Sequence, residues 1–354
     1  MLDRVPGWAR AGLAGAAILT VPLWLRDPYY LHLAITIAMF SIAALGARLL
    51  LLVGLWSFGQ GVFLTIGAYT SAILVADLGL SFWASLPIAA FGGAVAAAAV
   101  GYPALRLRGV YFAIFTMVLV FAVREGIILS PGVTGGASGF LGVPPPDPIA
   151  IGGVEVSFGP QERYAIVAAL LVLTMGVMYR IDRSRLGKAL AAIRQGEVLA
   201  ESVGINLTRY RVGAFVIAAF FTTATGAFSA HYYGVAHPET WGLWPSIFII
   251  AYAIIGGVGS VFGPVAGATV GVLIVELLRA TEGLQGVLLG VALIIVGLVM
   301  PGGLTGAVSK ETVDRIVGRL PERRCLAWVQ RLRRPADPPS MTPVEDGTGE
   351  RRVP

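Results

Sequence analysis

The chain has 354 residues, of which 56% are hydrophobic and only 13% are charged, and its formal net charge at pH 7 is +6. A soluble domain carries about 25% charged residues, so this composition excludes a soluble enzyme or a nucleic-acid-binding domain and indicates an all-α polytopic membrane protein. The excess of basic residues then marks loops kept in the cytoplasm. The single Cys325 excludes an internal disulfide framework and a cysteine metal cluster.

Apolar stretches long enough to cross a bilayer core of about 30 Å recur along the chain. We expect about ten transmembrane helices, and eight spans with a pair of re-entrant segments also fit the pattern. The first stretch follows basic residues as a signal peptide does, but another apolar stretch begins directly after it, which favours a true span. In chain order the expected spans are residues 11–26, 29–47, 55–76, 82–101, 110–129, 164–180, 212–233, 243–257, 262–279 and 284–300.

Two of these regions are interrupted by glycine, which is typical of membrane helices that break or that approach one another closely. The segment 49–76 is too long for one plain span, and the region 256–271 carries three glycines spaced four residues apart on one helical face. Close packing and the lining of a substrate pathway are both open interpretations. The residues singled out are Gly59, Gln60, Gly61, Gly257, Gly259, Gly263 and Gly267.

The distribution of basic residues predicts the orientation. Seven basic residues occur from Arg180 to Arg211, against three acidic ones, and the tail after Met300 has ten basic and seven acidic residues. The segment 130–163 has one basic residue, at its very end. The positive-inside pattern therefore predicts an even number of spans, with both termini and the loop 181–211 cytoplasmic and the loop 130–163 external.

Composition divides the chain into a membrane domain, residues 1–308, and a charged, proline-rich cytoplasmic tail, residues 309–354. Residues 309–332 are compatible with an amphipathic helix. The composition beyond Arg334 is typical of disorder.

The loop 181–211 is predicted to contain two short helices. Ser184 can cap the first, and the second, residues 197–203, ends at Gly204. The apolar residues of the first helix share one face and are Leu186, Leu190 and Ile193. A docking element for a partner and a surface helix resting on lipid headgroups are both open interpretations.

Within this loop, Gly187 can allow close approach of a partner backbone. Glu197 can either cap the second helix, where the helix dipole favours a carboxylate, or pair with a basic residue of a partner. The residues assigned to the element are Arg185, Gly187, Arg194, Glu197, Glu201 and Gly204.

Motifs for chemistry are missing from the sequence. Lysine occurs only at 188 and 310, and no G-x-x-x-x-G-K-[ST] phosphate loop, H-E-x-x-H or C-x-x-C occurs. The segment Gly136–Gly139 is similar to the nucleophile turn of intramembrane serine proteases, but prolines follow it and prevent it from continuing as a transmembrane helix. We expect no catalytic residue and no metal site.

A transporter that powers itself needs ionisable groups at mid-depth in the membrane. The candidates are Arg124, Glu125, Glu276 and Arg279. Each acid lies near a base in sequence, so ion pairs at helix ends are favoured over a coupling-ion site.

Five segments together resemble the permease subunit of the branched-chain amino acid ABC importers, of the LivM type, in family order over about residues 30–305. One of them, the external Thr-Gly-Gly segment, comprises Thr134, Gly135 and Gly136. The sequence departs from the family at Phe58 and Gln60, where leucine and histidine are expected, and in its long charged tail. The five segments are residues 59–70, 106–113, 134–139, 184–205 and 256–264.

The resemblance implies a permease that translocates branched-chain or other hydrophobic amino acids delivered by an external binding protein. It implies a second, related permease chain, two cytoplasmic ATPase subunits that dock on the loop 184–205, and a place in the bacterial cytoplasmic (inner) membrane. ATP would be used by the partner subunits, and this chain would bind no cofactor. Urea or short amides are alternative substrates within the family, and a secondary transporter is the alternative from another class.

Overall fold

The computed structural model describes residues 27–107, 109–151, 154–156 and 159–277, together with 287, 290, 291, 303 and 304. The predicted span 11–26, most of the span 284–300, and the tail 309–354 with its expected amphipathic helix lie outside the described residues.

Eight apolar helices account for most of this part of the chain, and each coincides with a predicted span to within a few residues. The count of ten spans stays a prediction. Five helices are long enough to cross a membrane: α2 (Pro28–Leu51), α4 (Phe82–Ala104), α5 (Val110–Ile128), α7 (Pro160–Arg183) and α10 (Leu207–Tyr233). Three are shorter: α3 (Gln60–Ala76), α11 (Leu243–Gly256) and α12 (Phe262–Leu277).

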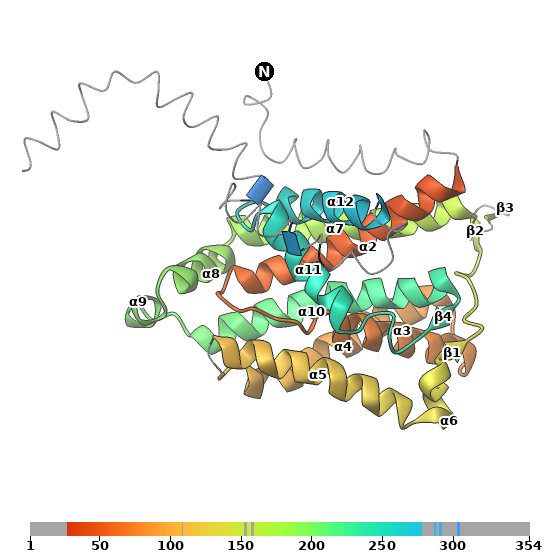
Figure 1. The fold of residues 1–354 in the computed structure, drawn as a ribbon, viewed down its shortest axis with the longest axis horizontal. Helices are drawn as coiled ribbons and strands as arrows, with labels where there is room; N and C mark the ends of the chain where they lie inside the picture. The colour runs from red at the N-terminus through yellow and green to blue at the C-terminus, as the bar shows by residue number, and fades with distance from the viewer. Residues whose placement is uncertain are drawn as a thin grey trace, which may run out of the picture. The chain divides into compact units, whose positions relative to one another are not determined.

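The helix α10 lies in the middle of the bundle, between α2 on one side and α3 and α4 on the other (Figure 1). Every residue from Phe221 to His231 is buried, and most of them are small. Small residues allow neighbouring helices to approach closely in a membrane. The Thr225 hydroxyl donates to the Phe221 carbonyl oxygen within the helix, while the buried Thr223 hydroxyl has no hydrogen-bond partner among the described residues.

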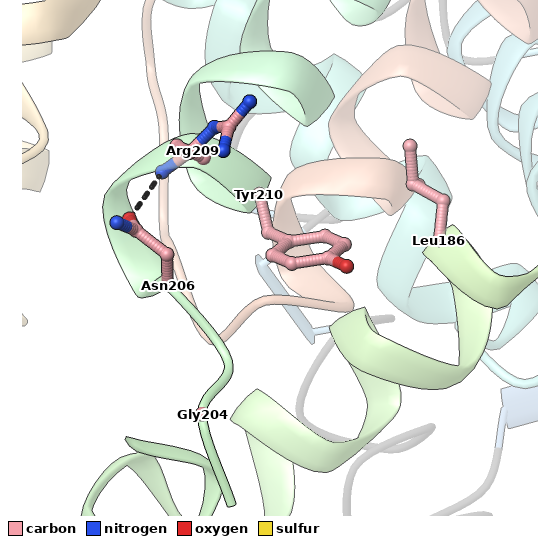
Figure 2. Close-up of a pocket in the computed structure, with 5 residues that line it drawn as sticks. All are labelled: Leu186, Gly204, Asn206, Arg209 and Tyr210. Atoms are coloured by element: carbon pink, nitrogen blue, oxygen red, sulfur yellow. Dashed lines mark hydrogen bonds between the residues drawn. The ribbon is translucent and has the colours of Figure 1, made fainter.

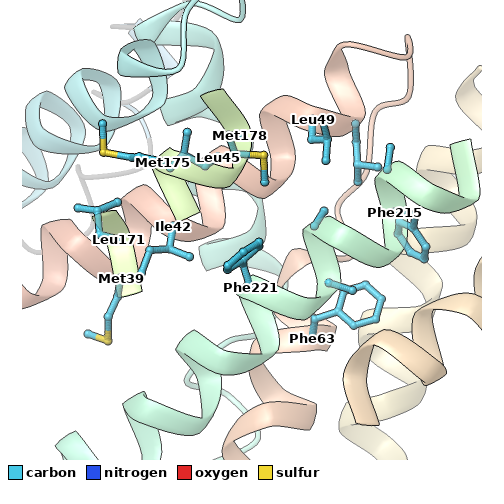
Figure 3. Packing of buried hydrophobic residues seen from close by; sticks show 14 of the residues in the cluster. Met39, Ile42, Leu45, Leu49, Phe63, Leu171, Met175, Met178, Phe215 and Phe221 are labelled. Carbon is cyan, nitrogen blue, oxygen red and sulfur yellow. The ribbon is translucent and has the colours of Figure 1, made fainter. Parts of the chain in front are cut away.

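The crossing of α3 and α10 brings the two backbones into contact. A Cβ atom added to Gly67 would lie 2.0 Å from the Thr223 carbonyl oxygen, and one added to Gly226 would lie 2.0 Å from the Leu64 carbonyl oxygen. Neither position has room for a side chain. Around this crossing, long apolar side chains of α2 and α7 fill the remaining space together with Phe63, Phe215 and Phe221 (Figure 3).

The predicted span 55–76 is wrong in its first five residues. α2 ends at Leu51, Gly54 turns the chain with a φ of +73°, and α3 begins only at Gln60. Glycine adopts this left-handed conformation without steric cost. The segment between the helices is irregular but buried at Leu55, which is 1% exposed.

The two long loops lie at opposite ends of the bundle (Figure 1). One contains α8 (Arg185–Gln195) and α9 (Glu197–Ser202). The other contains the short elements α6 (Pro131–Thr134), η2 (Gly136–Ser138), β1 (Phe140–Leu141), β2 (Ile149–Ile151) and β3 (Val154–Val156). β1 pairs antiparallel with β4 (Val235–Ala236), which follows α10, and β2 pairs with β3. This arrangement agrees with the predicted opposite locations of 181–211 and 130–163, while the side each faces stays a prediction.

Candidate functional site

The α8–α9 loop forms two helices, as expected. The Ser184 hydroxyl accepts a hydrogen bond from the Gly187 N–H at 3.3 Å, which confirms the predicted cap. After α9 ends, Gly204 has a φ of +83°, so it terminates the helix in the left-handed conformation that was expected of it.

The apolar face of α8 points into the protein. Leu190 and Ile193 are 0% and 1% exposed. Leu190 belongs to the main core that α2, α7 and α10 build, and Ile193 packs with Ala200 of α9 and Leu207 of α10. This face is therefore not available to a partner, because the chain's own core already covers it.

Gly187 serves a contact within the chain. A Cβ atom at this position would lie 2.3 Å from the Ile181 carbonyl oxygen and 2.9 Å from the Asp182 Cα atom. The glycine thus allows α8 to fold back on the last turn of α7. A bulky substitution here would first disturb this junction, before it could obstruct any partner.

Glu197, the first residue of α9, pairs with Arg211 of α10. The Arg211 side chain is only 5% exposed, whereas the Glu197 side chain is 39% exposed, so the pair lies at the edge of the buried region. No side chain makes a capping hydrogen bond to α9, but Glu197 lies in its first turn, where the helix dipole favours a carboxylate, and its basic partner belongs to the same chain. The two residues are 14 positions apart, and sequence reasoning missed the contact because nothing in the helical spacing brings them together.

The outward side of the loop is formed by α9 and the residue that follows it. Val198, Leu199 and Val203 are 81%, 70% and 69% exposed, and we call these three residues the α9 apolar surface. Single exposed apolar residues are common, but an adjacent group at the tip of a polar loop marks an interaction site. The charged residues Arg185, Arg194 and Glu201 of the same loop are also exposed.

Two clefts adjoin the turn that joins α9 to α10. The first has a volume of about 430 Å³, and in it Tyr210 of α10 projects toward Leu186 of α8 (Figure 2). The second, of about 400 Å³, is lined by Glu201 and the residues from Gly204 to Thr208. Asn206 holds the turn, since its Oδ1 atom accepts a hydrogen bond of 3.0 Å from the Arg209 N–H at the start of α10. The loop therefore carries the α9 apolar surface and, at the turn that follows α9, two clefts.

The predicted residues at the start of α3 join three helices. The buried Gln60 accepts a hydrogen bond of 2.9 Å from the Thr222 hydroxyl on α10. The Gly61 N–H donates to the Ser246 hydroxyl on α11 at 3.0 Å, and a Cβ atom on Gly61 would lie 2.2 Å from the Trp241 carbonyl oxygen. Gly59 is the residue that precedes α3. These contacts indicate that Gln60 and Gly61 hold α3 against α10 and α11.

The segment Thr134–Gly136 closes the turn after α5. The Thr134 hydroxyl donates to the carbonyl oxygens of Ile127 and Ser130 at 2.7 and 2.8 Å, and it accepts from the Gly136 N–H at 3.2 Å. Gly135 has a φ of +74°, and a Cβ atom there would lie 2.2 Å from the Gly139 carbonyl oxygen. The residues thus fix the shape of the loop that begins at α6.

The glycines of the late motif hold α11 against α12. A Cβ atom on Gly267 would lie 1.9 Å from the Tyr252 carbonyl oxygen, and one on Gly263 would lie 2.1 Å from that of Gly257. Gly257 itself ends α11 with a φ of +98°. Gly259, in contrast, has open space around its Cα atom.

The expected ion pair near the end of α5 is confirmed. The Arg124 guanidinium lies 3.4 Å from the Glu125 carboxylate and also pairs with Glu239 in the segment before α11. Glu276 accepts a hydrogen bond of 2.9 Å from the Tyr29 hydroxyl, while Arg279 lies outside the described residues. The contacts of Arg124 favour a helix-end ion pair over a coupling-ion site, while the expected pairing of Glu276 with Arg279 stays a prediction.

Comparison with known proteins gives consistent matches. A family model described as the permease component of branched-chain amino acid transport systems matches residues 29–297. The high-affinity branched-chain amino acid transport system permease protein LivM of Salmonella typhimurium is 33% identical over 286 residues, which cover 75% of this chain and 67% of that protein. LivM of Escherichia coli is 32% identical over the same shares. LivH of Escherichia coli is 32% identical over 151 residues, or 41% of this chain and 46% of LivH. No solved structure matches the chain significantly.

Proposed function

The chain belongs to the family of permease components of branched-chain amino acid transport systems, and from this premise we propose that it carries branched-chain or other hydrophobic amino acids across a bacterial cytoplasmic membrane. It is a permease subunit of an ABC importer. The substrate proposal is supported chiefly by the two LivM proteins, whose matches cover three quarters of this chain.

The proposed substrate can be tested in proteoliposomes that hold the complete complex and its external binding protein. We expect ATP-dependent uptake of leucine at least tenfold faster than uptake of urea or acetamide, and unchanged uptake when proton and sodium gradients are dissipated. The measurement is radiolabelled substrate retained per permease. Faster uptake of urea or acetamide than of leucine would contradict the proposed substrate.

The partners follow from the same premise. A second permease chain, related but different, completes the membrane part, which the similarity to both LivM and LivH supports. Two cytoplasmic ATPase subunits hydrolyse ATP, so this chain binds no cofactor, and an external binding protein delivers the amino acid to the end of the bundle that carries α6 and β1. Both termini are cytoplasmic in this arrangement.

The α9 apolar surface is the proposed contact with an ATPase subunit. It lies at the end of the bundle opposite the loop 130–151 (Figure 1), where the basic residues predict the cytoplasm. Its three side chains are between 69% and 81% exposed, while the inward face of α8 anchors the loop to the core. An apolar projection on a fixed base, next to two clefts, is suited to insertion into a groove of a partner.

Replacing Leu199 with aspartate tests this contact. Burying an unpaired carboxylate in the interface costs several kcal/mol, which corresponds to roughly a hundredfold or greater loss of affinity. We expect the Leu199→Asp permease to reach the membrane in normal amounts and to retain at least tenfold less ATPase subunit on purification. Leu141→Asp is the matched control, since Leu141 is 69% exposed at the opposite end of the bundle. Equal recovery of the ATPase with both variants would exclude the α9 apolar surface as the contact.

A further inference from the structure

A buried arginine joins three elements near the α8–α9 loop. Arg48, in the last turn of α2, is 1% exposed. Its two terminal nitrogens donate to both carboxylate oxygens of Asp182, at 3.2 and 2.8 Å. Its Nε atom donates to the Val258 carbonyl oxygen at 2.8 Å. A single guanidinium thus connects the end of α2, the end of α7 and the turn between α11 and α12.

The chemistry of this contact is specific to arginine. The planar guanidinium matches a carboxylate with two parallel hydrogen bonds and retains a third donor for the carbonyl group. Lysine carries the same charge, but its ammonium group cannot make the two parallel hydrogen bonds to a carboxylate. The Arg48 side chain is 2% exposed and that of Asp182 is 28% exposed. Apolar residues of similar volume often pack as stably as a buried charge with its partner, so stability alone does not account for placing an arginine here. The pair fixes geometry among the three elements.

On one side, the contact leads to the α8–α9 loop. Asp182 stands two residues before Ser184, which caps α8. Gly187 of α8 packs directly on the backbone of Ile181 and Asp182, so α8 and the end of α7 are in backbone contact. This contact is a route by which a displacement of α8 can reach the Asp182 carboxylate.

On the other side, the contact leads to α11 and α12. Val258 follows Gly257, where α11 ends, and the backbones of the two helices touch through Gly263 and Gly267. The close packing joins the two helices, so a displacement of Val258 can reach both. At its far end, Ser246 of α11 accepts a hydrogen bond from the start of α3.

We propose that Arg48 is a positioning residue that transmits movement of the α8–α9 loop to the α11–α12 pair, and so links ATP hydrolysis to opening of the substrate pathway. This inference rests on the proposed docking of the ATPase on the α9 apolar surface. ATP-driven closure of the ATPases shifts a two-state equilibrium of the permease, and Arg48 ties the two elements that must change together.

The test measures the number of amino acid molecules imported per ATP hydrolysed, in proteoliposomes with saturating binding protein. In Arg48→Met we expect the complex to assemble and basal ATP hydrolysis to stay at the wild-type rate, while import per ATP falls at least tenfold. Arg48→Lys should give an intermediate ratio, because it retains the charge without the two parallel hydrogen bonds. Arg183→Met is the matched control, since Arg183 is exposed next to Asp182 and stacks on Tyr179; its ratio should equal that of the wild type.

If Arg48 served folding alone, the result would differ. The Arg48→Met substitution would then lower the amount of complex, or lower import and ATP hydrolysis together, and would leave the number of molecules imported per ATP unchanged. If Arg48→Met fails to assemble, the double variant Arg48→Met/Asp182→Leu removes both charges and restores an apolar match. We expect this variant to assemble and to remain uncoupled. A wild-type ratio in the double variant would overturn the proposal.

Failure of this proposal can be distinguished from failure of the docking proposal. The ratio is measured only in complexes that retain the ATPase subunit, whereas the Leu199→Asp experiment measures that retention itself. Normal import per ATP in an assembled Arg48→Met complex rejects the role of Arg48 and leaves the docking surface untouched.

Discussion

Replacing Gly267 with leucine is expected to separate α11 from α12 and to reduce the assembled complex recovered in detergent at least tenfold. Even the first side-chain carbon, the Cβ atom, would lie 1.9 Å from the Tyr252 carbonyl oxygen. The colliding atoms belong to the backbone, so they cannot rotate out of the way as a side chain can. Overpacking a core costs about 1–3 kcal/mol, and more where backbones must part. The measurement is the monodisperse fraction on size-exclusion chromatography after solubilisation.

The control for Gly267→Leu is Gly126→Leu, because Gly126 on α5 has open space where a Cβ atom would stand. Gly267→Ala should show a partial loss, since it introduces the colliding Cβ atom but no further bulk. Normal recovery and import for Gly267→Leu would show that α11 and α12 do not pack in this way.

Replacing Gly226 with leucine is the second change with a large expected effect. Gly226 lies on α10 against the Leu64 backbone, and Gly67 on α3 lies reciprocally against Thr223, so a side chain on either one forces the central helices apart. α10 packs against α2, α3 and α4. Its displacement therefore disturbs α2 and α4 as well as α3. We expect little or no folded permease in the membrane fraction, measured by fluorescence of a fused reporter.

Gly213→Leu is the matched variant on the same helix, because a Cβ atom on Gly213 would have no other atom within 4 Å. It should accumulate at the wild-type level, since leucine is a better helix former than glycine, which is about 0.8–1 kcal/mol less favourable than alanine in a helix interior. Equal accumulation of the Gly226 and Gly213 variants would contradict the close crossing of α3 and α10.

The helices were predictable because hydrophobic length is a local property of the sequence. The start of α3 was not, since Gly54 and Gly59 both stand within an apolar stretch and only their backbone angles show where the helix begins. The spacing of Gly263 and Gly267 predicts a shared helical face, with close packing as one of two interpretations. Their partner atoms on Tyr252 and Gly257 could not be predicted, because spacing within one helix carries no information about the helix opposite.

The candidate loop illustrates the same limit. The spacing of Leu190 and Ile193 correctly predicts an apolar face on α8, but both an inward and an outward orientation satisfy the pattern. The fold directs that face to the core and leaves Val198 and Leu199 of α9 outside. Glu197 likewise has a charged partner, although it is Arg211 of the same chain. Sequence identifies residues that need a contact, and the tertiary structure decides which contact they make.

The bond between Arg48 and Asp182 also constrains how the chain is made. The two residues are 134 positions apart, and at about 5–20 residues per second the ribosome adds Asp182 on the order of ten seconds after Arg48. Until α7 enters the bilayer, α2 carries a cation without its partner, and such a group stays at the lipid headgroups or in water. The contact between α2 and α7 can therefore form only late in biosynthesis, and a permease truncated before α7 leaves the Arg48 guanidinium without its carboxylate partner.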